Sequence, residues 1–165
     1  MNKQKNYALP IAMMFALFFM ISFVTGLQNP MGVIVKDQFN ASNLMSQLGN
    51  FANFIAYACM GIPAGIMLQR IGYKKSALIA VIVGFIGVAI SYFSGIAGAA
   101  NLNVTYAIYL CGAFISGFSM CMLNTIVNPM LNTLAGGGKK GNQLIQIGGV
   151  FNSTGATIVP VLVGA

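Results

Sequence analysis

Three asparagines stand four residues apart in the most apolar part of this chain: Asn124, Asn128 and Asn132. Residues at this spacing lie on one face of an α-helix, so the three amides form a stripe. The surrounding segment, from Ser76 to Gly138, carries no charged residue. An amide that faced lipid tails would leave its donors and acceptors unpaired, which is unfavourable. The stripe must therefore face other helices or a water-filled cavity, where amides can bind the hydroxyl groups of a neutral polar solute.

The composition excludes several classes of protein. Of the 165 residues, 58% are hydrophobic and only 5% are charged, whereas about a quarter of the residues of a soluble domain are charged. Asp37 is the single acid and there is no His, so general acid–base catalysis has almost no groups to use. The basic residues stand in small clusters at the ends of apolar runs, as in membrane loops, which argues against nucleic acid as a partner. We predict an integral membrane protein that is not an enzyme and has no cofactor.

The end of the first apolar run carries a second group of polar residues. Gln28 and Asn29 stand there, and Pro30 follows them. Proline has no N–H to donate to the carbonyl of Gly26, which leaves that oxygen free for a ligand or a water. We predict that Gln28 and Asn29 contribute to substrate binding. Ordinary capping of a helix end is the equally favoured alternative.

Other polar or reactive side chains are interpreted as structural. Asn50 and Asn53 are placed near the outer mouth, where bonding between helices is favoured over solute binding. The three cysteines fall inside apolar runs, without metal-ligand spacing and without a His to complete a site. Small buried hydrophobic residues are therefore the favoured interpretation of Cys59, Cys111 and Cys121, and no metal site is predicted.

Five apolar runs are long enough to cross a bilayer as helices, since about 20 residues span the hydrocarbon core. Two basic clusters between these runs, Arg70 with Lys74 and Lys75 and then Lys139 with Lys140, indicate cytoplasmic loops. The N-terminus is then also cytoplasmic, and we expect the plasma (inner) membrane. The predicted helices are residues 7–28, 44–68, 76–93, 106–130 and 143–165.

The last apolar run continues to the final residue of the chain, and no polar tail follows it. Five helices with an apolar end look like the first part of something longer. We therefore expect the missing second half of the same polypeptide to be a partner of these residues. The other expected partners are the lipid bilayer and a small neutral polar solute.

One stretch of sequence points to a family. The segment GIMLQRIGYKK, residues 65–75, resembles the signature that joins the second and third helices in the major facilitator superfamily, G-x-x-x-D-R-x-G-R/K-R/K. Gln69 stands where the superfamily has the acid that helps lock the cytoplasmic gate, so such a lock is in doubt here. The resemblance places Gly65, Arg70, Gly72, Lys74 and Lys75 in a cytoplasmic gate loop.

Four further motifs narrow the resemblance. LFFMISFVTGLQNP, IPAG, the NP of NTIVNP and FNSTG stand in the order and spacing of the fucose/galactose/glucose symporter family. The similarity covers essentially the whole chain, as the first five of twelve helices. It implies an all-α membrane protein in which residues 1–165 form a partial N-terminal six-helix bundle, with the rest of the protein missing. It also implies a secondary transporter, in this family a symporter, that moves a hexose or deoxyhexose by alternating access.

The resemblance also assigns individual residues. Asn152 in FNSTG matches a sugar-contacting position of the family. Asn124 and Asn128 in NTIVNP, together with Gln28 and Asn29, are the other predicted substrate-binding residues. Family members that use protons carry acids at the positions that resemble Asn29 and Asn124, and both are amides in this chain. The coupling ion therefore stays open between proton, sodium and none.

Two other functions compete with sugar transport. A drug or metabolite exporter of the same fold would want a broad apolar pocket and often a membrane-embedded charge, which the amide stripe argues against. A non-transporting membrane scaffold would need no polar face at all. An integral membrane enzyme is the least favoured alternative, because His and acids are lacking.

Overall fold

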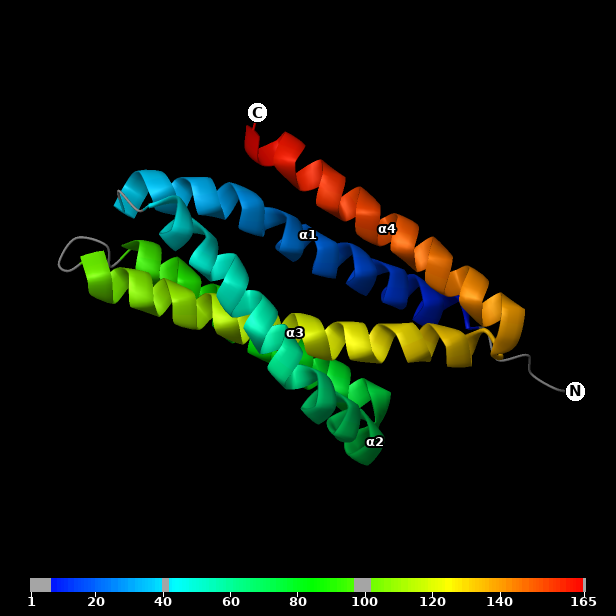
Figure 1. Ribbon diagram of the computed structural model, residues 1–165. Coiled ribbons are helices and arrows are strands. Elements are labelled where there is room, and N and C mark those ends of the chain that lie inside the picture. The colour runs from blue at the N-terminus through cyan, green and yellow to red at the C-terminus, as the bar shows by residue number, and fades with distance from the viewer. Residues whose placement is uncertain (1–6, 40–41, 97–101, 165) are drawn as a thin grey trace, which may run out of the picture.

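Helices make up nearly all of the computed structural model, which describes residues 7–39, 42–96 and 102–164 (Figure 1). Within these ranges the chain forms α1 (Ala8–Phe39), α2 (Asn43–Ile96), α3 (Leu102–Leu134) and α4 (Gly138–Gly164). Each of the four is long and apolar enough to cross a membrane. The prediction of an all-α protein with long apolar helices is confirmed.

The second and third predicted helices are the two arms of one element, α2. Gly72 has φ 77° and ψ 170° and is the only non-helical residue within α2. Glycine adopts a positive φ readily because it has no Cβ, so the chain can reverse direction there within a single residue. Figure 1 shows α2 folding back on itself. We call residues 43–71 the first arm and residues 73–96 the second arm.

The first helix is longer than predicted. The sequence placed its end near Gln28, followed by a loop that contained Lys36 and Asp37, but α1 continues to Phe39. Pro30 removes one backbone hydrogen bond and kinks or weakens a helix without necessarily ending it. The residues after Pro30 are mostly apolar, so the helical pattern resumes, and Lys36 and Asp37 are exposed on the last turns of α1.

Contacts between helices fix their relative directions. Gly49 packs against Tyr109, and Asn53 Nδ2 donates to the carbonyl of Ala113 at 3.3 Å, so the first arm runs parallel to α3. The second arm runs antiparallel to α3, with Ala80 beside Ser119 and Ser91 beside Gly112. Helices α1 and α4 run parallel, as shown by the contacts of Phe18 with Gly148 and of Ser22 with Gly155.

The core lies along α3, which is the central helix of the bundle. Met122, Ile126, Val127 and Leu131 are almost completely buried. They pack against buried residues of α1 and of both arms of α2, including Phe18, Ile21, Ala64 and Ala80. Burial of one face of α3 leaves its remaining face to carry the amides.

Candidate functional site

The amides Asn124 and Asn128 lie one turn apart on α3, and both are half-buried. Asn124 Nδ2 donates to the carbonyl of Met120 at 3.2 Å, and Asn128 Nδ2 donates to the carbonyl of Asn124 at 3.0 Å. A carboxamide has two N–H donors and a carbonyl oxygen with two lone pairs, so one such bond leaves most of its capacity unused. We call these two residues the amide row.

Tyr57, from the first arm of α2, faces the amide row. Its hydroxyl lies close to the side chains of Asn124 and Cys121, and the residue is 39% exposed. Sequence reasoning did not select Tyr57 as a site residue. The signal was its position four residues after Asn53, which places both side chains on one face of the helix.

Asn53 belongs to the packing between helices. It is 4% exposed, and its Nδ2 donates to the carbonyl of Ala113 at 3.3 Å and to Met120 Sδ at 3.8 Å. Asn50 donates to Gln47 Oε1 at 2.9 Å on an exposed part of the same arm. The contacts of Asn53 agree with the bonding between helices that the sequence favoured, whereas the printed bond of Asn50 stays within its own arm.

Asn132, the third amide of the stripe, has different neighbours from the other two. It packs against the first turns of α4, where a methyl group added to Gly141 would lie 1.8 Å from Asn132 Oδ1. The Oδ1 atom is buried and accepts no hydrogen bond. Asn132 therefore contributes to the contact between α3 and α4 rather than to a shared face with Asn124 and Asn128.

Asn152 lies on α4, half-buried, on the side that contacts α1. Its neighbour Phe151 stacks on Phe15 of α1 with ring centroids 5.1 Å apart, and Gly148 and Gly155 contact α1 one turn before and after. No described hydrogen bond joins Asn152 to the amide row. Of the remaining predicted site residues, Gln28 and Asn29 lie within α1, and their side chains fall outside the described part of the structure.

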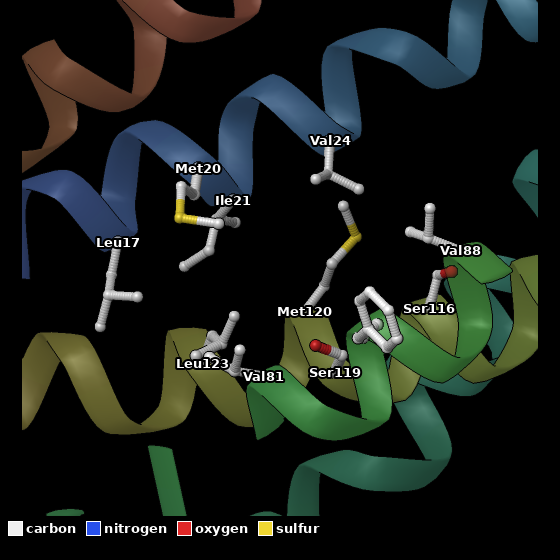
Figure 2. A pocket seen from close by; sticks show the side chains of 12 residues that line it. Leu17, Met20, Ile21, Val24, Val81, Val88, Ser116, Ser119, Met120 and Leu123 are labelled. Carbon is white, nitrogen blue, oxygen red and sulfur yellow. The ribbon is translucent and has the colours of Figure 1, made fainter. Parts of the chain in front are cut away.

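A cavity of about 240 Å³ lies between α1, the second arm of α2 and α3. Figure 2 shows Met120 projecting from α3 towards α1 within it. The hydroxyls of Ser116 and Ser119 on its wall already donate to the carbonyls of Gly112 and Ala80, at 2.9 and 2.6 Å. The other lining residues are almost all apolar, among them Leu17, Ile21, Val24, Val81, Val88 and Leu123. This cavity fits an apolar group, and none of the predicted substrate-binding residues lines it.

A shallow hollow on the outside of α4 carries more polar groups. Gln146, Ser153, Thr154 and Thr157 line it. The two threonine hydroxyls donate to carbonyls of their own helix at 2.8 and 2.9 Å, which satisfies them without a solute. Gln146 is exposed, as is Gln143 one turn before it.

The predicted gate-loop residues surround the bend of α2. Arg70, Lys74 and Lys75 are exposed, whereas Gly65 and Gly72 are half-buried. A methyl group added to Gly65 would meet nothing within 4 Å. The signature therefore forms a one-residue reversal between two helical arms rather than an extended loop.

The cysteines and metal-binding groups offer no further site. Cys121 is buried, as predicted, but Cys59 and Cys111 are exposed on the outer sides of α2 and α3, so their interpretation as buried residues is wrong. They belong to helix faces that no other described helix covers. No group of three or more His, Cys, Asp or Glu residues could hold a metal ion in the described part of the chain.

Comparison with known proteins identifies relatives over nearly the whole chain. Residues 14–165 match the Major Facilitator Superfamily. A glucose/galactose transporter of Brucella abortus biovar 1 (strain 9-941) is 31% identical over 160 residues, which are 97% of this chain and 37% of that protein. A putative glucose/galactose transporter of Helicobacter pylori (strain ATCC 700392 / 26695) is 30% identical, over 98% of this chain and 37% of the relative.

A third relative is named for its coupling ion. The L-fucose-proton symporter of Escherichia coli (strain K12) is 26% identical over 97% of this chain and 35% of its own length. The chain thus spans little more than a third of the length of these relatives. No solved structure matches the chain.

Proposed function

The chain belongs to the Major Facilitator Superfamily, and on that premise we propose that it is part of a secondary transporter that moves a sugar, a hexose or deoxyhexose, by alternating access. The amide row carries this proposal. Asn124 and Asn128 are half-buried on a helix with an apolar core face and keep unused donors and acceptors. Intramembrane polar residues of this kind mark solute pathways. The sugar-transporter names of the relatives support the same solute class.

We propose five membrane spans, with each arm of α2 crossing separately. Each arm exceeds the length of about 20 residues that a spanning helix needs. The bend at Gly72 and the junction of α3 with α4 both carry exposed basic residues, which supports a cytoplasmic position for them by the positive-inside rule. On this topology the N-terminus is cytoplasmic, and the membrane is the plasma (inner) membrane.

The sugar site is proposed to be shared with a second helical bundle. The chain spans about 37% of the length of the first relatives, and transporter sites lie between repeats near the middle of the bilayer. Asn124, Asn128 and Asn152 would form one wall of a separate cavity between the two bundles, with Gln28 and Asn29 at the end of the predicted first span. The gate-loop residues Gly65, Arg70, Gly72, Lys74 and Lys75 would lie on the cytoplasmic side.

These residues supply no proton site. Asp37 is the single acid and is exposed near the end of α1, and amides such as Asn29 and Asn124 do not ionise in the physiological range. If the protein uses protons, the site lies in the second bundle. We favour facilitated diffusion over sodium coupling, because no carboxylate accompanies the amide oxygens to balance a cation's charge.

The test is sugar binding and uptake by the full-length transporter in liposomes. Asn128→Ala and Asn152→Ala should each weaken binding by about 0.5–1.5 kcal/mol, the usual contribution of one hydrogen bond to a neutral group. Asn103→Ala is the matched control, because Asn103 is an exposed amide at the opposite end of α3 from the core. If both variants bind sugar like the parent protein, Asn128 and Asn152 do not form the site. Export of apolar compounds in place of sugar uptake would favour the exporter.

A further inference from the structure

Five exposed basic residues lie at two turns of the described chain: Arg70, Lys74 and Lys75 around the bend of α2, and Lys139 and Lys140 in the first turn of α4. We call these five residues the basic end. Sugar transport does not require them to bind a solute, because a neutral sugar offers no charge for a cation to recognise. The positive-inside rule accounts for the side of the membrane on which they lie, but it does not say what these cations bind.

Helix directions bring the two clusters to the same end of the bundle. The first arm of α2 runs parallel to α3, from the contact of Gly49 with Tyr109 to that of Ala56 with Gly117. When the same pairing is continued along both helices, the bend at Gly72 lies level with the end of α3. The α3–α4 junction follows directly, since α4 begins at Gly138. Figure 1 shows the bend and the junction at the same side of the bundle.

No carboxylate neutralises the basic end. Asp37, the single acid of the chain, lies near the last turn of α1. Because α1 runs parallel to α4, with Phe18 on Gly148 and Ser22 on Gly155, its last turns lie at the opposite end from Lys139. Lys36 is also there, beside Asp37. The bundle thus has one end with five unneutralised cations and another where the charges of Lys36 and Asp37 cancel.

We propose that the basic end binds the phosphate headgroups of anionic lipids. Apolar helices lead into it, and Tyr73, which is half-buried and precedes Lys74 in the sequence, packs against the core. On the proposed topology these cations would meet the lipid headgroups. Each Lys or Arg near an anionic surface contributes about 1 kcal/mol of attraction. A lipid phosphate meets this surface with its acyl chains along the exposed apolar faces of the second arm, such as Leu78 and Ile82. A free phosphate or a nucleic acid has no group to place there.

The experiment compares lipid retention between variants of the protein extracted from membranes in mild detergent. With equal amounts of phosphatidylglycerol and phosphatidylcholine present, native mass spectrometry counts the lipids that remain bound. The parent protein should retain phosphatidylglycerol in preference. Lys140→Gln should lower this preference several-fold, up to about fivefold for a cation in direct contact with a headgroup. Replacement of all five cations by Gln should abolish it, and Lys140→Arg should preserve it.

Lys36→Gln is the matched control, since it removes the same charge at the opposite end of the bundle. It should leave the preference unchanged, and an equal loss in Lys36→Gln would overturn the proposal by showing a non-specific effect of net charge. Equal retention of the two lipids by the parent protein would also overturn it. The proposal would also be overturned if excess inorganic phosphate displaced phosphatidylglycerol completely. Tighter binding of a short single-stranded DNA by the same five cations would overturn it as well. Helical content measured by circular dichroism verifies that each variant is folded.

Discussion

Two groups of polar side chains on α3 have opposite surroundings. On one side Ser116 and Ser119 face the second arm of α2, both less than 10% exposed. On the other side the amide row, Asn124 and Asn128, is half-buried. Both groups interrupt the same apolar helix, so polarity alone does not distinguish a structural residue from a functional one.

The serine side is closely packed. We call the contact of Gly84, Gly87 and Ser91 with Gly112, Ser116 and Ser119 the glycine–serine seam. A methyl group added to Gly112 would lie 2.8 Å from the backbone nitrogen of Ser91, so the two backbones approach closely. Ser119 Oγ donates across the seam to the carbonyl of Ala80 at 2.6 Å. Small residues that permit such an approach drive the association of helices in membranes.

The amide side is neither closely packed nor fully bonded. Each amide donates one hydrogen bond to its own helix, the Tyr57 hydroxyl lies close to Asn124, and both amides keep further hydrogen-bonding capacity. Hydrogen-bond completeness and closeness of packing, rather than polarity, therefore separate the two regions. Substitutions in the seam should change stability, and substitutions in the amide row should change sugar binding.

The largest effect is expected from Gly87→Leu, which tests the seam. A Cβ at Gly87 would lie 2.7 Å from the backbone nitrogen of Ser116 and 3.0 Å from the carbonyl oxygen of Gly112. Neither backbone atom can move without parting the helices, so we expect a loss of about 3 kcal/mol or more in the free energy of unfolding. Denaturation followed by circular dichroism in detergent measures it. Gly95→Leu, at an exposed position of the same arm with nothing within 4 Å, should be nearly neutral; equal losses would contradict close packing at the seam.

Local sequence properties predicted much of this fold. Hydropathy predicted approximately where the helices lie. The basic clusters predicted that the bend of α2 and the α3–α4 junction lie on the same side. Both predictions use only residues that are neighbours in the sequence. The course of α1 past Pro30 was missed, since a proline signals a helix end only on average. Which helices pair could not be predicted either, because small residues can pack against many partners. The arrangement of all the helices determines that Gly87 packs against Ser116 and Gly155 against Ser22.

The surroundings of the predicted site residues were foreseen only in part, for a related reason. Four-residue spacing correctly placed Asn124 and Asn128 on one helix face, but it could not tell what covers that face. The first turns of α4 cover the end of α3, so Asn132 packs against Gly141. Tyr57 was missed because its importance depends on α2 lying beside α3, a contact between residues far apart in the sequence.

A smaller effect is expected from Asn124→Leu, which tests the amide row. The change keeps a side chain of similar size and removes the amide, so the free energy of unfolding should fall by less than about 1.5 kcal/mol. Sugar binding should weaken by about 0.5–1.5 kcal/mol, roughly two- to twelvefold in Kd. Isothermal titration calorimetry of the full-length transporter measures the Kd.

Ser119→Ala is the reciprocal variant for that experiment. It removes a hydrogen bond across the seam, where such bonds contribute about 0.6 kcal/mol on average in membranes, and it should leave the Kd for sugar unchanged. If Ser119→Ala weakened sugar binding as much as Asn124→Leu, the two sides of α3 would not differ in function, and the comparison would fail.

The smallest effect is expected from Tyr57→Phe, which asks whether the amide row is positioned by its neighbour. The substitution keeps the ring on the first arm and removes the hydroxyl that lies close to Asn124. If this contact only orients the amide, its loss should cost about 0.6 kcal/mol, roughly a threefold rise in the Kd for sugar. Tyr92→Phe is the matched control, because Tyr92 is 67% exposed on the second arm.

The double variant Tyr57→Phe with Asn124→Leu then separates a role of Tyr57 in orienting the amide from a direct contact with the sugar. A residue that acts only through Asn124 adds nothing once the amide is gone, so the double variant should bind like Asn124→Leu alone. Additive losses would show instead that the Tyr57 hydroxyl contacts the sugar directly, and that the site extends from α3 onto the first arm of α2.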